Sequence, residues 1–237
     1  FSLPIYRLLG LTENFHQIEN KLLENFSPYF WRVASIDNAG NENWSPWFKF
    51  ILHVPPSSAV QSISPYWSPG SISITANASD NDGTVENVEL WYRYSIDNSS
   101  WGDYLLFSID TDGSDGWTWT FTFDNGIGFY EFYTRAWDER GNYENIPSVA
   151  DSSCGYDNVN PTQPALLTPE NNATIYESYG RPRFEWTKAY DNVGAFPGSG
   201  VTYRLIISTD AGFNNVVYNK SGIVDNYHTS ENSLSEG

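Results

Sequence analysis

Trp117-Thr118-Trp119-Thr120-Phe121-Thr122-Phe123 alternates aromatic and threonine residues without a break, and the turn sequence Asp124-Asn125-Gly126 follows directly. Because side chains of a β-strand point alternately to its two faces, this alternation puts four aromatic rings on one face and three hydroxyls on the other. A further apolar run covers 129–138, and strand, Asn-Gly turn and strand together predict a β-hairpin. The stretch therefore predicts antiparallel β structure with an aromatic core.

The same period of two recurs elsewhere in the chain, while helical periodicity is nearly absent. Residues 71–78, 88–94 and 201–208 each read as a strand, and in the second of them Val88, Leu90, Tyr92 and Tyr94 share one face. Short strands separated by frequent turns are typical of β-sandwiches. We therefore expect an all-β protein made of tandem immunoglobulin-like and fibronectin-III-like sandwiches.

Composition narrows the possible partners. The 237 residues carry a net charge of -17, from 29 acidic and 12 basic side chains. Such an acidic surface repels phosphate backbones, so we expect no nucleic-acid partner. No stretch is long and apolar enough to predict a membrane span. Cys154 is the only cysteine, so no disulfide can form within the chain.

Two proline-marked linkers divide the sequence. One is Val54-Pro55-Pro56-Ser57-Ser58, and the other runs over 157–164 and includes Asn160-Pro161. They predict three segments, 1–54, 57–157 and 161–237, of which only the middle one holds a full set of strands.

A gap-free internal repeat relates the two outer segments. Residues 213–236 match residues 1–24 at a constant offset of about 212 residues. The matched pairs are Phe213 with Phe1, Tyr218 with Tyr6, Asn226 with Asn14, His228 with His16, Glu231-Asn232 with Glu19-Asn20, Leu234 with Leu22 and Glu236 with Glu24. We therefore expect the first segment to be the C-terminal half of a sandwich, and the last to be the N-terminal half of a homologous one.

The outer segments resemble fibronectin-III-like domains of bacterial and archaeal surface proteins. The resemblance rests on Tyr-Phe-Trp-Arg-Val-Ala-Ser-Ile-Asp-Asn-Ala-Gly-Asn at 29–41, and on Pro-Arg-Phe-Glu-Trp at 182–186 with the strand at 203–210. The middle segment resembles microbial immunoglobulin-like repeats through Ala-Ser-Asp-Asn-Asp-Gly at 78–83, Trp-Tyr-Arg-Tyr-Ser at 91–95 and Asp-Glu-Arg-Gly-Asn at 138–142. It implies an extracellular or cell-surface location and a sandwich fold, but no single task.

Half-sandwiches expose apolar faces and unpaired strand edges, so each outer segment needs a complement. We expect that complement head to tail, from an adjacent repeat or another copy of the chain. In this arrangement Trp31 and Trp186 share one core across the junction. The middle segment also offers Tyr130 as a tyrosine corner, with Phe132 where antibody domains carry a cysteine.

The positions of three aspartates suggest a calcium site. Asp80 and Asp82 fall in one loop and Asp138 in another, and these loops lie at the same end of a sandwich. Three carboxylates there suit a hard cation, so calcium is the predicted cofactor. The alternative is turn chemistry, since Asp-x-x-Gly-Asn occurs at both Asp37 and Asp138 and serves equally well to close a hairpin.

Catalytic signatures are missing from the sequence. His16, His53 and His228 have no zinc-type spacing, and no nucleophile elbow or phosphate loop is present. We therefore predict a non-catalytic structural repeat: a spacer, stalk or filament subunit. The alternative is an adhesive module for a carbohydrate or a surface receptor, because Trp91 and Trp101 could stack on sugars. Possible N-glycosylation sequons begin at Asn25, Asn43, Asn77, Asn98, Asn172 and Asn219.

Overall fold

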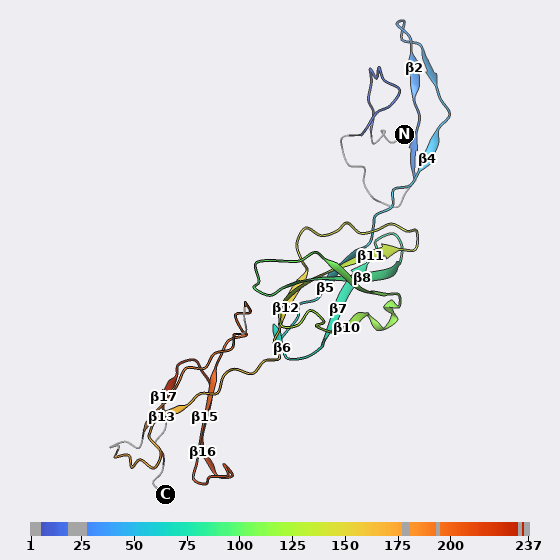
Figure 1. The fold of residues 1–237 in the computed structure, drawn as a ribbon. Helices are drawn as coiled ribbons and strands as arrows, with labels where there is room; N and C mark the ends of the chain where they lie inside the picture. Colours follow the sequence, from blue (N-terminus) through green and yellow to red (C-terminus); the bar gives the residue numbers. More distant parts are fainter. Residues whose placement is uncertain (1–5, 19–27, 177–180, 193–194, 232–233, 235–237) are drawn as a thin grey trace. The chain divides into compact units, whose positions relative to one another are not determined.

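The computed structural model describes residues 6–18, 28–176, 181–192, 195–231 and 234 (Figure 1). The described chain is all-β apart from one short 3-10 turn, as predicted. It forms two compact units, 1–54 and 55–237. None of the described helical residues forms a segment suited to crossing a membrane.

The first unit contains one long antiparallel hairpin. Its inner part joins β2 (Ala34–Ile36) to β3 (Glu42–Trp44), and its outer part joins β1 (Tyr29–Trp31) to β4 (Phe48–Phe50). The registers Tyr29↔Phe50 and Ala34↔Trp44 differ by one residue, so an irregularity separates the two parts, and the hydrogen bond from Ser45 N to Val33 O extends the inner one.

Residues 57–156 of the second unit form a sandwich of two sheets. The smaller sheet has the order β10-β7-β5 and contains β5 (Ser57–Val60), β7 (Ile72–Ser79) and β10 (Trp117–Phe121). The larger has the order β6-β12-β11-β8-β9 and contains β6 (Trp67–Ser68), β8 (Val85–Ser95), β9 (Leu105–Asp110), β11 (Gly128–Asp138) and β12 (Ser152–Tyr156). The 3-10 turn η1 (Gly113–Asp115) precedes β10.

Aromatic side chains fill the space between these sheets. Phe121 is buried at its centre, with its ring centroid 4.9 Å from that of Phe132 and 5.8 Å from that of Tyr130. The predicted faces are confirmed: the aromatics of β10 point inward and Thr118 and Thr120 are exposed. Ring burial and edge-to-face packing here replace the missing disulfide.

The hairpin predicted from Asp124-Asn125-Gly126 is wrong. β10 pairs with β7, while β11 pairs with β8 and β12, so the turn carries the chain from one sheet to the other. The two strands lie in opposite sheets and face each other across one core, where Phe121 of β10 packs against Phe132 of β11. Tyr130 Oη donates to Gly126 O at 2.6 Å, so the predicted tyrosine corner is present.

Residues 161–231 add two further sheets to the second unit. One has the order β13-β14-β17 and contains β13 (Leu166–Thr168), β14 (Arg183–Trp186) and β17 (Tyr227–Thr229). The other pairs β15 (Tyr203–Ser208) with β16 (Val216–Ile223). Phe196 is buried against Trp67 and Phe129 of the sandwich, with ring centroids 5.8 and 6.1 Å away. The predicted three-domain division stays a prediction.

Candidate functional site

The middle sandwich serves as a template for the incomplete sheets at 161–231. Its strands β5, β7 and β10 have counterparts in β13, β14 and β17, and its strands β8 and β9 have counterparts in β15 and β16. Counterparts of β11 and β12 are missing from the described part of this segment. On the side away from β16, β15 has no paired strand among the described residues.

The hairpin of the first unit supplies the two missing types of strand. Tyr29 to Asn41 aligns without a gap with Tyr130 to Asn142, so β1 and β2 correspond to β11. The turns after them are built alike: the backbone N–H of Asn41 donates to Asp37 Oδ1 at 2.9 Å, and that of Asn142 donates to Asp138 Oδ1 at 2.8 Å. The two outer segments are therefore complementary in their strand content.

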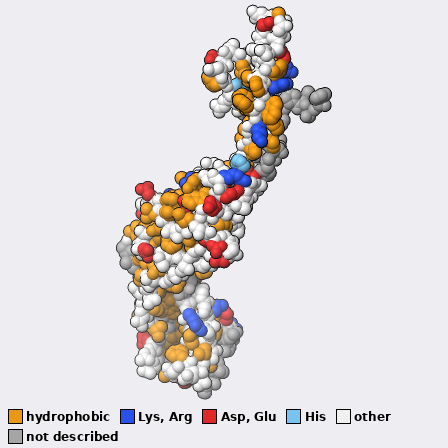
Figure 2. Space-filling view, turned by 90° about the vertical axis from the view of Figure 1, so that its right-hand side faces the viewer, with side chains coloured by type: hydrophobic (Ala, Val, Ile, Leu, Met, Phe, Trp, Pro, Cys, Tyr) orange, Lys and Arg blue, Asp and Glu red, His pale blue; other side chains and the backbone are white. Residues whose placement is uncertain are grey.

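Trp31 shows what this hairpin lacks. It aligns with Phe132, which is fully buried in the middle sandwich, yet 52% of Trp31 is exposed. Its ring lies edge-to-face with that of Phe48, with centroids 6.0 Å apart, and Phe48 is itself exposed. Figure 2 shows hydrophobic side chains at the surface of the first unit. Among the described residues, the hairpin thus presents a core-type aromatic at its surface, as a face that binds a further layer does.

Trp186 has a different environment. It is 4% exposed, and Tyr203 from the facing sheet contacts its ring at 5.2 Å. Trp186 thus joins the two sheets of the C-terminal segment, and its indole Nε1 is buried without a hydrogen-bond partner. Trp31 and Trp186 lie in different units, so their predicted shared core stays a prediction.

The internal repeat is also visible as a conserved contact geometry within the chain. Tyr218 of β16 and His228 of β17 are hydrogen bonded at 2.7 Å, with ring centroids 5.9 Å apart. Their repeat counterparts, Tyr6 and His16, are hydrogen bonded at 2.8 Å with the same centroid distance. The histidines therefore have a structural role at both places.

Asp138 closes a turn, as the turn interpretation of its motif predicts. Its Oδ1 accepts from the backbone N–H groups of Arg140 and Asn142, and its Oδ2 accepts from Asn142 Nδ2. Burial alone would raise the pKa of Asp138, but the bonds from Asn142 and Arg140 outweigh it and hold the pKa below its ordinary value.

The loops carrying Asp80, Asp82 and Asp138 do meet at one end of the sandwich. Glu139 Oε2 accepts from Thr84 N at 2.7 Å, and Arg140 Nη1 donates to Asp82 O at 3.3 Å. Asp80 Oδ1 accepts from the N–H of Asp82. Over the described ranges, no three acidic, histidine or cysteine side chains are grouped so as to hold a metal. The calcium site at these three residues stays a prediction.

The outer face of the large sheet carries a layer of aromatic and charged side chains. Trp91 stacks on Tyr133 with centroids 6.0 Å apart, and its Nε1 donates to Glu89. Arg93 covers the rings of Trp101 and Tyr104 at 5.0 and 4.8 Å. The two tryptophans are half-buried, so part of each side chain packs within the domain and part lies at the surface.

The predicted glycosylation residues lie at the surface where the structure describes them. Asn43, Asn77, Asn98, Asn172 and Asn219 are exposed. Asn25 lies outside the described residues.

Sequence reasoning missed two carboxylates that join the sheets of the middle sandwich. Glu144 accepts from the N–H groups of Ser58 and Ala136, and Asp151 Oδ2 accepts from those of Val60 and Thr134. They satisfy donors of β5 on the side away from β7 and donors of β11 on the side away from β8. Nothing in the local sequence distinguishes them, because their partners are remote along the chain.

The comparison with family models agrees with the fold of the middle sandwich. Residues 62–140, within the middle sandwich, match the family model described as a bacterial Ig domain, which confirms the resemblance predicted for this segment. A solved structure of Clostridium thermocellum CbhA fibronectin(III)-like modules is similar over 55% of this chain and 62% of that chain, with 15% sequence identity and a TM-score of 0.31. The alignment thus spans less than two thirds of that structure. No curated protein matches the chain.

Proposed function

We propose that this chain is a non-catalytic, extracellular structural repeat whose sandwiches are completed head to tail. The observation that carries the proposal is complementarity: β1 to β4 correspond to the strands that β13 to β17 lack. The half-exposed Trp31 supports it, since its counterpart Phe132 is a central core residue. Adjacent repeats or copies of the chain are the proposed partners, and a spacer, stalk or filament is the resulting assembly.

The chemistry of the described residues supports a structural role. Cys154 is the only cysteine of the sequence, and burial raises the pKa of its thiol to about 12. The thiol therefore stays protonated and is not a nucleophile at neutral pH. The histidines at 16 and 228 are each hydrogen bonded to a tyrosine at the same repeat position. Exposed sequon asparagines fit a secreted, glycosylated surface protein, which is the proposed location.

Concatemers test the spacer directly. Chains of two, three and four repeats, joined at the period of the internal repeat, should lengthen by a constant increment in small-angle X-ray scattering. Each added repeat should also add the same unfolding enthalpy, because repeats contact only their neighbours. A maximum dimension that stops growing, or a collapse into one globule, would contradict the proposal.

An adhesive module is the second candidate, and Arg93 with Trp101 and Tyr104 favours it. Aromatic rings beside a charged pair, Arg93 and Glu131, can stack on a sugar and bond its hydroxyls. The chain would be titrated with oligosaccharides while tryptophan fluorescence is followed. Saturable quenching that Trp101→Ala removes, with unchanged unfolding, would support this candidate over the spacer.

A further inference from the structure

Asp157 follows β12 directly, where the chain leaves the middle sandwich. Asp191, from the C-terminal segment, approaches it there. The N–H of Asp157 donates to Ser68 O of β6 at 3.0 Å. The N–H of Ser199 lies between the two carboxylates, 3.2 Å from Asp157 Oδ2 and 3.1 Å from Asp191 Oδ2. Asp157 Oδ1 also accepts from the N–H of Val159 at 3.0 Å, but the two carboxylates share the single donor of Ser199, and none of these backbone donors carries a full positive charge.

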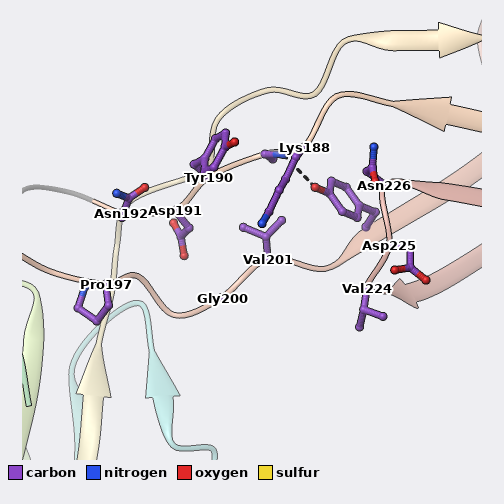
Figure 3. A pocket seen from close by; sticks show the side chains of 12 residues that line it. Lys188, Tyr190, Asp191, Asn192, Pro197, Gly200, Val201, Val224, Asp225 and Asn226 are labelled. Atoms are coloured by element: carbon purple, nitrogen blue, oxygen red, sulfur yellow. Dashed lines mark hydrogen bonds between the residues drawn. The ribbon is translucent and has the colours of Figure 1, made fainter.

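Both carboxylates are shielded from water. Asp157 is 9% exposed and Asp191 is 8% exposed, and Asp191 Oδ1 is buried with no hydrogen-bond donor. Figure 3 shows the Asp191 side chain pointing toward the loop that carries Pro197 and Gly200. Lys188 and Asp191 line one pocket, but the Lys188 ammonium lies over the ring of Tyr190, and no ion pair to Asp157 or Asp191 occurs in the described part of the chain.

A buried carboxylate oxygen without a donor or countercharge is unfavourable, and a second carboxylate nearby makes it more so. A cation removes both costs at once. The available ligands are hard oxygens: Asp191 Oδ1, Asp157 Oδ2 and the adjacent hydroxyl of Ser199, which bonds Asp191 Oδ2 at 2.9 Å. Hard oxygen donors of this kind suit Ca²⁺, which accepts a more variable coordination geometry than Mg²⁺ does.

We propose that Asp157 and Asp191 bind a calcium ion at the joint between the middle sandwich and the C-terminal segment. Two carboxylates leave most of the coordination to water, so the dissociation constant should lie at about 10⁻⁴–10⁻³ M, the range of extracellular modules. The site is separate from the predicted set of Asp80, Asp82 and Asp138. It needs only residues of the second unit, so it does not rest on the proposed head-to-tail assembly.

A bound ion would fix the joint. Asp157 is held to Ser68 of the sandwich, whereas Asp191 and Ser199 belong to the segment that packs Phe196 against Trp67. A ligand that binds only the folded arrangement stabilises it by mass action. Calcium should therefore raise the melting temperature of the full chain, and a chelator should reverse the change.

The test is calorimetric titration of the full chain with CaCl₂ at physiological salt, which screens diffuse attraction to the acidic surface. We expect one saturable site, weakened about tenfold or more by Asp191→Asn, in line with the loss of a ligand-shell group. Asp103→Asn, at an exposed aspartate of the middle sandwich, is the matched control and should leave the affinity unchanged. If Asp191→Asn does not fold, Asp157→Asn replaces it.

Several outcomes would overturn the proposal. One is the lack of saturable binding by the unmodified chain, which no folding defect of a variant can explain. Another is binding that Mg²⁺ matches and salt removes, because that indicates a diffuse ion atmosphere. Calcium binding abolished by Asp80→Ala but retained by Asp191→Asn would place the ion in the predicted loops instead.

Discussion

At the scale of single residues, Tyr130 links the turn chemistry to the core. Its ring is fully buried among Phe121, Phe123 and Tyr94, and its hydroxyl donates to Gly126 O. Burial raises the pKa of Tyr130, so the hydroxyl stays protonated and remains a donor.

Removing that hydroxyl should destabilise the sandwich. Tyr130→Phe leaves the ring in place and deprives the part-buried Gly126 carbonyl of its donor, so we expect a loss of about 1–3 kcal/mol in the free energy of unfolding. Urea titration followed by fluorescence measures it. Tyr92→Phe is the control on the neighbouring strand. Equal midpoints for the two variants would show that the tyrosine corner contributes nothing.

Asp210 gives a pH-dependent prediction. Its carboxylate accepts from the backbone N–H groups of Asn215 and Asn214, which lower its pKa from 3.8 to about 2. Because the folded pKa lies below the unfolded one, the contribution of Asp210 to stability is complete above the unfolded value. It is lost as the pH falls from about 4 toward 2.

Carboxyl NMR titration of the full chain measures this pKa directly. In parallel, the difference in stability between the unmodified chain and Asp210→Asn should shrink as the pH falls through the same window. A carboxyl that titrates near its ordinary value, or a difference that is independent of pH, would contradict the assignment.

At the scale of elements, β10 has a buried and an exposed residue next to each other, so substitutions at the two positions separate the effect of core packing from that of a surface change. Phe121 is buried at the centre of the core, while its neighbour Thr120 is exposed and pairs with Ser73. Phe121→Ala should cost about 3–5 kcal/mol through lost burial and the cavity left behind. Thr120→Ala should change stability by less than about 0.5 kcal/mol. Denaturant unfolding compares them, and similar losses would mean that the face assignment is wrong.

The same strand shows what local sequence can and cannot predict. The aromatic and threonine alternation predicted the faces correctly, because side-chain direction depends only on position along a strand. The partner of β10 was predicted wrongly, because Asn-Gly favours a tight turn whether the next strand joins the same sheet or crosses to the other. In the same way, the motif Asp-x-x-Gly-Asn does not reveal whether its aspartate closes a turn or binds a cation.

The joint at Asp157 and Asp191 was missed for a different reason. Ser199 brings these residues together only after two segments have packed, and no spacing in the sequence records that contact. The complementarity of the two outer segments was predictable from the sequence, because it follows from the internal repeat and from the match between 29–41 and 130–142. Repeats carry non-local information that single motifs lack.

At the scale of the whole molecule, the central expectation is that the outer segments complete one sandwich. Residue 237 corresponds to residue 25 in the repeat, so a copy of residues 26–54 appended after Gly237 continues the sequence in register. This copy brings strands like β1 to β4 to the open side of β15. The copied Trp31 should then enter a core together with Trp186, as Phe132 does in the middle sandwich.

The extended chain should therefore unfold with an additional cooperative transition and show blue-shifted tryptophan emission relative to the original chain. Burying the exposed half of one tryptophan ring contributes about 3 kcal/mol, enough to be seen in a denaturant titration. The control is the same extension with the copied Trp31 replaced by Asp, which places a charge where the core should form. If both extended chains unfold alike, the added strands do not pack on the C-terminal segment, and the complementarity of the two halves has no structural consequence.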